Sequence, residues 1–312
     1  MSGSAGAPLL PGSAGAARTG RGSAPVRAPG EPSLREAGAG IRSLGRPRPR
    51  PAEVVSAVIL ILLVAAALAP QLFTATDPLA IAPASAFTPP SPGHWFGTDE
   101  SGRDIFTRVI YGARTSLLIG LCATAIGMLL ALLLGSLAGL GPRPVDFGVN
   151  RLLEVLFAFP GLLLALVFIT IFGVGVTSAT VAVGLATAPG YARIIRSEIR
   201  SIRLSGHIEA AVVLGRSPAQ IFRRNILPNV AAGLFALATL GVGQAIVWAS
   251  ALSFLGLGAV PPAAEWGAML SAGRTYISLA WWLTFFPGAF VVLSAAAATV
   301  LGRSLQRRNR ER

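Results

Sequence analysis

An all-α, polytopic membrane protein with six transmembrane helices is the fold class that the sequence predicts, on the grounds of composition and charge patterning. Of the 312 residues, 53% are hydrophobic and 12% are charged, whereas a soluble domain carries about 25% charged residues. The mean hydropathy is +0.66. Windows of 23 to 40 residues without a charge recur along the chain. This composition excludes a soluble enzyme, a disordered protein and, because Cys122 is the single cysteine, a disulfide-rich secreted module.

The charge-free windows place the spans in chain order, because about 20 apolar residues cross a hydrocarbon core. The window from Glu154 to Arg193 encloses 38 residues, which is too long for one span, and a turn signal at 173–178 divides it into two. The 40-residue window from Arg224 to Glu265 holds one span followed by irregular backbone at 256–262. The predicted spans are 54–73, 116–140, 153–173, 178–195, 229–255 and 280–301.

Arginine placement predicts the orientation. All 26 basic residues are arginine, and a cytoplasmic N-terminus puts 22 of them on the inside and four on the outside, as the positive-inside rule requires. We therefore expect a multi-pass protein of the cell (inner, cytoplasmic) membrane with both termini in the cytoplasm. Topology explains the net charge of +13, so nucleic acid is not expected as a partner.

The pattern of charge and hydropathy divides the chain into five predicted segments. Residues 1–52 are predicted to be a disordered cytoplasmic tail rich in Arg, Pro and Gly, either inert or in contact with anionic lipid. A first transmembrane helix at 53–73 and an extracytoplasmic loop at 74–113 follow. A core of five transmembrane helices spans 114–302 and contains a cytoplasmic loop at 193–228, and 303–312 is a basic cytoplasmic tail.

The extracytoplasmic loop ends in a motif of aromatic, charged and small residues. Trp95 and Phe96 are expected at headgroup depth. The charged members are expected to pair in water or against another chain, with direct substrate contact as the alternative. The motif comprises Gly97, Thr98, Asp99, Gly102, Arg103 and Asp104.

The loop at 193–228 contains two predicted short helices. The first covers 207–214 and ends at Gly215. Ser217 is a predicted N-cap, with Pro218 at the first helical position and Gln220 three residues after the cap, which is a capping-box pattern. The second helix runs to Leu227 and Pro228. A rigid helix pair that presents apolar residues beside arginines is predicted to dock into a partner.

This loop resembles the EAA loop of ABC-transporter permeases, with Glu209, Ala210 and Ala211 followed by Gly215 and ending at Leu227 and Pro228. A wider set of segments is similar to the second, C-type permease subunit of the dipeptide/oligopeptide/nickel family. These segments cover about 94–302 in the family's order and include 94–99, 102–104, 112–117, 191–193, 253–258, 261–262, 266–267, 273–274, 280–282 and 286–288.

The resemblance implies the permease fold of binding-protein-dependent (type I) ABC importers and half of a translocation pathway for di- or oligopeptides, or for nickel chelates. It also implies a homologous second permease, two ATPase subunits that bind ATP and Mg, and an extracytoplasmic solute-binding protein. The chain itself would need no cofactor. ATPase coupling would fall to Glu209, Ala210, Ala211, Gly215, Ser217, Leu227 and Pro228. The chain departs from the family at Arg303, where the pattern has Asp, and in the 141–146 loop.

Several single residues keep two interpretations. Glu154 lies three residues after Arg151, so an interfacial ion pair or a gating role fits. The prolines Pro160, Pro189 and Pro287 are either simple kinks or hinges that line the pathway. The adjacent tryptophans at 281 and 282 fit an aromatic belt or a substrate platform.

No catalytic constellation and no phosphate-binding loop occur in the sequence, so the chain is predicted to be a transport subunit and not an enzyme. His94 and His207 lie on opposite predicted membrane faces and cannot form a metal site with Cys122. The alternatives are an ATP-independent secondary transporter or channel, which should show an inverted repeat or buried ionisable residues, and a membrane-embedded enzyme.

Overall fold

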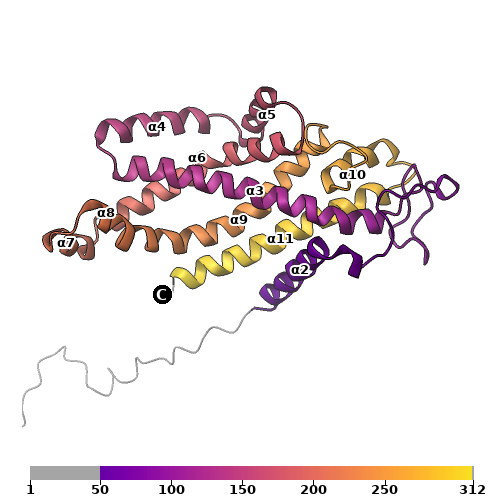
Figure 1. Cartoon of the computed structure of the whole chain (residues 1–312), viewed down its shortest axis with the longest axis horizontal. Helices are drawn as coiled ribbons and strands as arrows, with labels where there is room; N and C mark the ends of the chain where they lie inside the picture. The colour runs from indigo at the N-terminus through magenta and orange to yellow at the C-terminus, as the bar shows by residue number, and fades with distance from the viewer. Residues whose placement is uncertain (1–49, 311–312) are drawn as a thin grey trace, which may run out of the picture. The chain divides into compact units, whose positions relative to one another are not determined.

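The computed structural model describes residues 50–310, and all regular structure in this range is helical apart from two isolated bridges, Ser91–His94 and Thr98–Asp104 (Figure 1). Residues 1–49 and 311–312, which contain most of the predicted N-terminal tail, lie outside the described range. The longer helices are α2 (Pro51–Leu68), α3 (Ile105–Leu140), α4 (Arg143–Phe157), α5 (Gly161–Phe172), α6 (Val176–Arg203), α7 (Gly206–Val213), α9 (Leu227–Phe254), α10 (Trp266–Gly273) and α11 (Trp282–Arg310). The short elements are the 3-10 turns η1 (Pro70–Leu72), η2 (Pro83–Ser85) and η4 (Arg274–Tyr276), the four-residue helix α8 (Pro218–Ile221) and the π-helical segment η3 (Phe222–Ile226).

Four of these helices are long and apolar enough to cross a membrane: α2, α3, α9 over Gly233–Phe254 and α11 over Trp282–Arg308. The pair α4 and α5 passes the same criteria as one broken span. The predicted span at 178–195 corresponds to α6, whose 28 residues are ~42 Å long but are less apolar than the other spans and do not meet these criteria. The all-α membrane fold is confirmed. In the described part of the chain four helices meet the criteria for a span, or five if α4–α5 is one span, and the count of six, which includes α6, stays a prediction.

Helix ends differ from the prediction wherever charged residues continue a helix. The first span begins at Pro51, so residues 51 and 52 belong to α2 and not to the tail. The helix that contains the span predicted at 116–140 begins at Ile105. The prediction started too late because Arg108 and Arg114, which precede the charge-free window, lie inside this helix. Similarly, α11 continues through Arg310, so the described part of the predicted basic tail is helical. A charge-free window marks the apolar stretch of a helix and not its ends.

The span predicted at 153–173 is broken. Its two halves, α4 and α5, meet at an angle of 96° across the break at 158–160. Pro160 stands immediately before α5, and proline lacks the N–H that a continuous helix would use. By contrast, Pro189 and Pro287 lie inside the continuous helices α6 and α11, so the expectation of interrupted helices holds only at Pro160.

Small residues bring the central helices close together. In Figure 1, α3 runs beside α6, and α9 packs against both. A Cβ on Gly127 of α3 would lie 2.6 Å from Thr187 Oγ1 of α6, and one on Gly135 would lie 2.8 Å from Ile195 Cγ2. Membrane helices associate through such small residues because lipid tails provide no hydrophobic driving force. The α3–α6 pair therefore forms the scaffold on which the sites described next are built.

Candidate functional site

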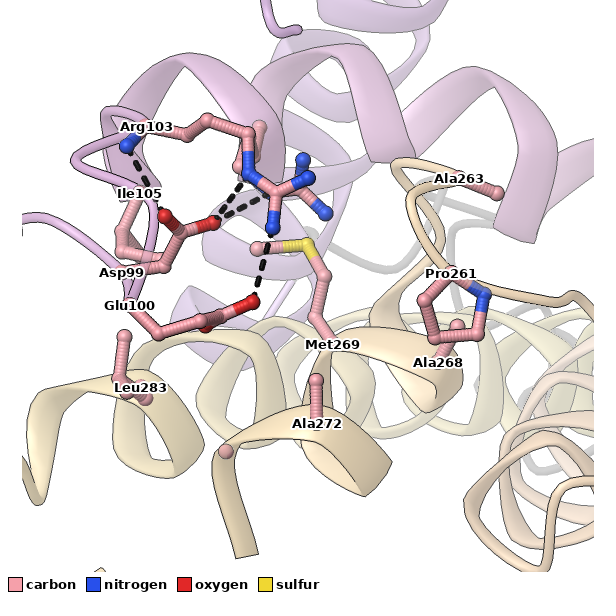
Figure 2. A pocket seen from close by; sticks show the side chains of 12 residues that line it. Asp99, Glu100, Arg103, Ile105, Pro261, Ala263, Ala268, Met269, Ala272 and Leu283 are labelled. Carbon is pink, nitrogen blue, oxygen red and sulfur yellow. Dashed lines mark hydrogen bonds and ion pairs between the residues drawn. The ribbon is translucent and has the colours of Figure 1, made fainter. Parts of the chain in front are cut away.

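A charge cluster is formed by Asp99, Glu100 and Arg103 of the loop that precedes α3 (Figure 2) and by Arg108 of α3. Arg103 Nε donates to Asp99 Oδ2 at 2.7 Å, and Arg103 Nη2 donates to Glu100 Oε1 at 2.9 Å. Arg108 donates to the carbonyl oxygens of Pro78 and Pro262 at 3.3 and 3.2 Å. The cluster therefore ties together the start of α3, the preceding loop and the segment between α9 and α10.

The charges are buried, which corrects the prediction that they pair in water. The Asp99 and Arg103 side chains are 6% and 10% exposed. The cause is the motif's own backbone, which folds over the bundle: Trp282 Nε1 donates to Thr98 O at 3.1 Å. Gly97 and Gly102 have φ of +75° and +76°, and a Cβ on Gly102 would lie 1.8 Å from Ala82 O. Both positions favour glycine.

The other motif residues organise the start of α3. Asp104 is the N-cap of this helix and accepts a hydrogen bond from the Thr107 amide at 2.8 Å. Its other oxygen lies 3.0 Å from His94 Nδ1. The motif is thus a folded structural unit, in agreement with the structural alternative considered for it.

The aromatic residues near this end have different environments. Trp95 and Trp281 are 64% and 52% exposed, as an aromatic belt requires, but Trp282 is 6% exposed. Phe96 stacks on Phe286 with ring centroids 3.9 Å apart. Phe96 and Trp282 therefore belong to the packed core, and the belt prediction fits Trp95 and Trp281.

A cavity of about 810 Å³, here called the aromatic cavity, opens at the break between α4 and α5. Pro160 and Pro189 line it, whereas Pro287 does not, so only two of the three predicted hinge prolines come together. Its wall combines residues from α4, α5, α6, α9 and the break. The main ones are Phe157, Phe159, Tyr191, Arg193, Gln244 and Trp248.

Two close contacts shape this cavity. The Arg193 guanidinium carbon lies 4.4 Å above the centre of the Phe157 ring, a cation–π distance. A Cβ on Gly161 would lie 2.1 Å from Trp248 Cη2, so only glycine leaves room for this indole at the start of α5. This group was not predicted as a unit, because its members lie on four helices and a turn that are distant in the sequence.

The α7–α8 loop, residues 204–226, has the predicted helix–turn–helix structure. Gly215 follows α7 with φ of +73°, which explains the glycine. Ser217 and Gln220 form the predicted capping box: Ser217 Oγ accepts from the Gln220 amide, and Gln220 Oε1 accepts from the Ser217 amide. The second helix is shorter than predicted, since α8 ends at Ile221 and η3 continues into α9 at Leu227, with Pro228 in the first turn.

One face of this loop is exposed and apolar. Leu204, Val213 and Leu214 are 83%, 86% and 73% exposed. Glu209 and Ala210 lie on the exposed side of α7, whereas Ile208 and Ala211 are buried. The buried face joins the core of α6 and α9 in a cluster that includes Ile195, Ile199, Ile221, Ile226 and Val230. The loop is therefore rigidly attached on one side and available for contact on the other.

An ion-pair group that was not predicted from the sequence links α4 and α6. Asp146, in the first turn of α4 and ahead of the predicted span, accepts from Arg196 Nε at 2.8 Å and from Arg196 Nη2 at 3.1 Å, and also pairs with Arg200. The hydrogen bond from Arg196 holds the pKa of Asp146 below its ordinary value. The i, i+4 spacing of the two arginines was the available signal.

A second missed residue is Glu265, which is 1% exposed. It caps α10 by accepting from the amides of Gly267 and Ala268 at 2.9 and 2.8 Å, and Ser116 Oγ donates to it at 3.1 Å. By comparison, the predicted pair of Arg151 and Glu154 forms at 3.3 Å but is exposed. Within residues 50–310, no three His, Cys, Asp or Glu side chains are grouped to hold a metal ion.

The comparisons with known proteins identify the family. The model of the binding-protein-dependent transport system inner membrane component family matches residues 131–311. The chain is 38% identical to the dipeptide transport system permease protein DppC of Alkalihalophilus pseudofirmus, over 81% of this chain and 83% of the relative. It is 41% identical to DppC of Bacillus subtilis over 70% and 68%. It is 36% identical to the probable D,D-dipeptide transport system permease protein DdpC of Escherichia coli over 82% and 86%.

Solved structures share the fold. An inward-facing MetNI methionine ABC transporter chain aligns with a TM-score of 0.53 at 19% identity, over 65% of this chain and 96% of that one. An amino acid ABC transporter crystallised with histidines aligns with a TM-score of 0.52 at 19% identity, over 65% and 94%. The helical membrane fold and the family match agree: the chain belongs to the family of inner-membrane components of binding-protein-dependent transport systems, and it is a transport subunit and not an enzyme.

Proposed function

We propose that this chain is the permease subunit of an ATP-driven importer of short peptides, and that it forms half of the translocation pathway. The relatives named for dipeptide and D,D-dipeptide transport, at 36–41% identity, support the substrate class. A homologous second permease, two ATPases and an extracytoplasmic binding protein complete the proposed assembly. The arginine distribution supports cytoplasmic termini.

The exposed apolar face of the α7–α8 loop is the observation that carries the proposal. Val213 and Leu214 are apolar and are 86% and 73% exposed. The positive-inside rule predicts that their loop lies in the cytoplasm, where exposure of apolar surface to water is unfavourable. Arg216 and Arg223, which are also exposed, flank this face. An apolar surface with a polar rim fits a protein partner, and we assign it to the ATPase.

The packing of the loop explains how a movement there reaches the pathway. Ile208 and Ala211 pack into the same cluster as Ile195 of α6 and Val230 of α9. These two helices also carry Tyr191 and Trp248 of the aromatic cavity. In this mechanism, nucleotide binding moves the docked loop, and α6 and α9 move with it, so that the cavity changes its access. The ligand drives the shift because it binds the two states with different affinity.

The experiment replaces an exposed apolar residue of the loop and follows both assembly and uptake. Val213→Asp should reduce co-purification of the ATPase subunits and lower peptide uptake, while the amount of permease in the membrane stays normal. Ile81→Asp is the matched control, because Ile81 is also apolar and exposed, at 67%, but lies on the loop before α3. The proposal is wrong if Val213→Asp retains the ATPases and transports as the unmodified complex does.

A second measurement distinguishes an ATP-driven importer from a secondary transporter or channel. Peptide uptake by the reconstituted assembly should require ATP, whereas a secondary transporter or channel would continue after ATP depletion. Uptake of a nickel chelate with no uptake of di- or tripeptides would replace the substrate class and leave the permease assignment in place.

A further inference from the structure

Arg193 is the only charged residue among those that line the aromatic cavity in the described part of the chain. The other lining side chains are apolar, aromatic or neutral and polar. Arg193 lies at the end of the predicted span 178–195, where the predicted cytoplasmic loop 193–228 begins, and is itself exposed. An arginine at this depth can face a cavity or the membrane surface, and here it lines the aromatic cavity.

The guanidinium is held in place but is not neutralised by the residues around it. Its central carbon lies 4.4 Å from the centre of the Phe157 ring, a cation–π contact that favours this position. Within residues 50–310, no carboxylate lies within 4.0 Å of it, whereas the nearby Arg196 is bound to Asp146 at 2.8 Å. Arg193 therefore keeps its donors for a group that enters the cavity.

We propose that Arg193 binds the C-terminal carboxylate of the peptide in transit, and that the aromatic wall accommodates its side chains. The inference rests on the proposed peptide substrate. Guanidinium donors match a carboxylate in a bidentate arrangement, and every linear peptide with a free C-terminus carries that group whatever its sequence. The cavity of about 810 Å³ falls within the range of roughly 300–1,000 Å³ that small-molecule sites occupy.

This site explains how one pathway can accept peptides of different sequence. The constant part of the ligand meets a charged, oriented donor, and the variable part meets Trp248, Phe159 and Tyr191, which offer apolar area with little directional demand. Gln244 of α9, whose Oε1 lies 3.5 Å from the Tyr191 hydroxyl, adds a neutral amide that a peptide bond can pair with. Arg193 precedes Arg196 and the α7–α8 loop along the chain. The site therefore lies next to the part of α6 that moves with the loop in the proposed mechanism.

The test compares L-alanyl-L-alanine with its C-terminal amide in the complete reconstituted transporter, with the binding protein saturated by each. Arg193→Gln should lower the ratio of acid to amide uptake by about tenfold, the effect of one charge-assisted hydrogen bond. Arg193→Lys should keep part of the preference, because lysine preserves the charge and not the fork. An acid-to-amide ratio equal to that of the unmodified complex would overturn the proposal.

A matched control separates the substrate from lipid as the source of the anion. Arg151→Gln removes an exposed arginine that lies outside the cavity, and its acid-to-amide ratio should not change. If Arg193 bound a lipid phosphate, Arg193→Gln would instead lower acid and amide uptake equally and only in vesicles with anionic lipid, and this result would refute the carboxylate site.

A photolabel keeps the inference testable if the Arg193 variants do not assemble. A dipeptide with a diazirine side chain and a free carboxylate should label segments 156–161 or 187–194 in the unmodified complex. Alanyl-alanine should compete for labelling more strongly than its amide. Labelling elsewhere, or equal competition by both, would contradict the site. Absence of any peptide uptake by the unmodified complex would refute the proposed function itself. This outcome differs from labelling at another segment and from equal competition by the two peptides, which refute only the Arg193 site.

Discussion

The buried charge cluster allows a quantitative prediction, because Asp99 neutralises Arg103 in a site that water barely reaches. Asp99 accepts three hydrogen bonds: from Arg103 Nε at 2.7 Å and from the amides of Ser101 and Arg103 at 2.9 Å each. Asp99→Asn keeps the size of the side chain but removes its charge. Breaking a buried pair by removing one partner costs about 3–5 kcal/mol, and the lower end applies here because Arg103 keeps its bond to the partly exposed Glu100.

The magnitude can be measured as a shift in thermal unfolding of the purified chain. For a chain of this size, 1 kcal/mol corresponds to roughly 2–4 °C in Tm, so 3 kcal/mol predicts a decrease of about 6–12 °C. Glu100→Gln is the matched control. The Glu100 side chain is 30% exposed and accepts one bond from Arg103, and an exposed pair contributes no more than about 1 kcal/mol.

A double-mutant cycle tests the reason for the loss as well as its size. Adding Arg103→Gln to Asp99→Asn should recover part of the stability, because it removes the arginine charge that the first change leaves buried. The reasoning fails if Asp99→Asn lowers Tm no more than Glu100→Gln does, or if the double variant is less stable than the sum of the two single changes.

Three further perturbations follow from local geometry. Gly161→Ala should lower stability by about 1–3 kcal/mol, because the new Cβ meets Trp248 Cη2 at 2.1 Å, and Trp248→Leu in the same chain should relieve it; calorimetry of both variants decides. Gly215→Ala should reduce ATPase co-purification, because φ of +73° costs an alanine about 1–2 kcal/mol, whereas Gly215→Asn should be tolerated. The ion pair of Asp146 should stabilise the chain above the ordinary carboxyl pKa near 3.8 and lose this effect as the pH falls through the lowered folded pKa. The Tm difference between unmodified and Asp146→Asn protein should therefore stay constant from pH 7 to about pH 5 and shrink as the pH falls below 3.8 toward the lowered folded pKa, and an undiminished difference at pH 3 would contradict the assignment.

Local features were predictable from the sequence because neighbouring residues determine them. The capping box at Ser217 and Gln220 needs only four residues, and the positive φ of Gly215 follows from the glycine at the helix end. The order of apolar helices was predictable for another reason: a charge within the hydrocarbon core is costly, so charge-free windows mark the spans.

Contacts between distant segments were not predictable in the same way. Arg108 reaches Pro262 across 154 positions, and Ser116 reaches Glu265 across 149. From the sequence alone, Arg108 and Glu265 look like solvated charges, because no neighbouring residue shows which segment will cover them. For the same reason the aromatic cavity could not be read from the sequence, although two of its prolines were singled out as pathway candidates.

The helix α6 illustrates why hydropathy and function diverge in this fold. Alanine, threonine and glycine make up much of its first half, and 12 of its 28 residues are buried, so its neighbours α3, α5 and α9 replace lipid around it. A helix shielded in this way does not need the hydropathy of a lipid-facing span, and its small residues allow close packing. The same shielding permits Tyr191 and Arg193 on its cavity side. The low hydropathy of α6 is therefore compatible with the predicted span at 178–195, because neighbouring helices cover much of its surface.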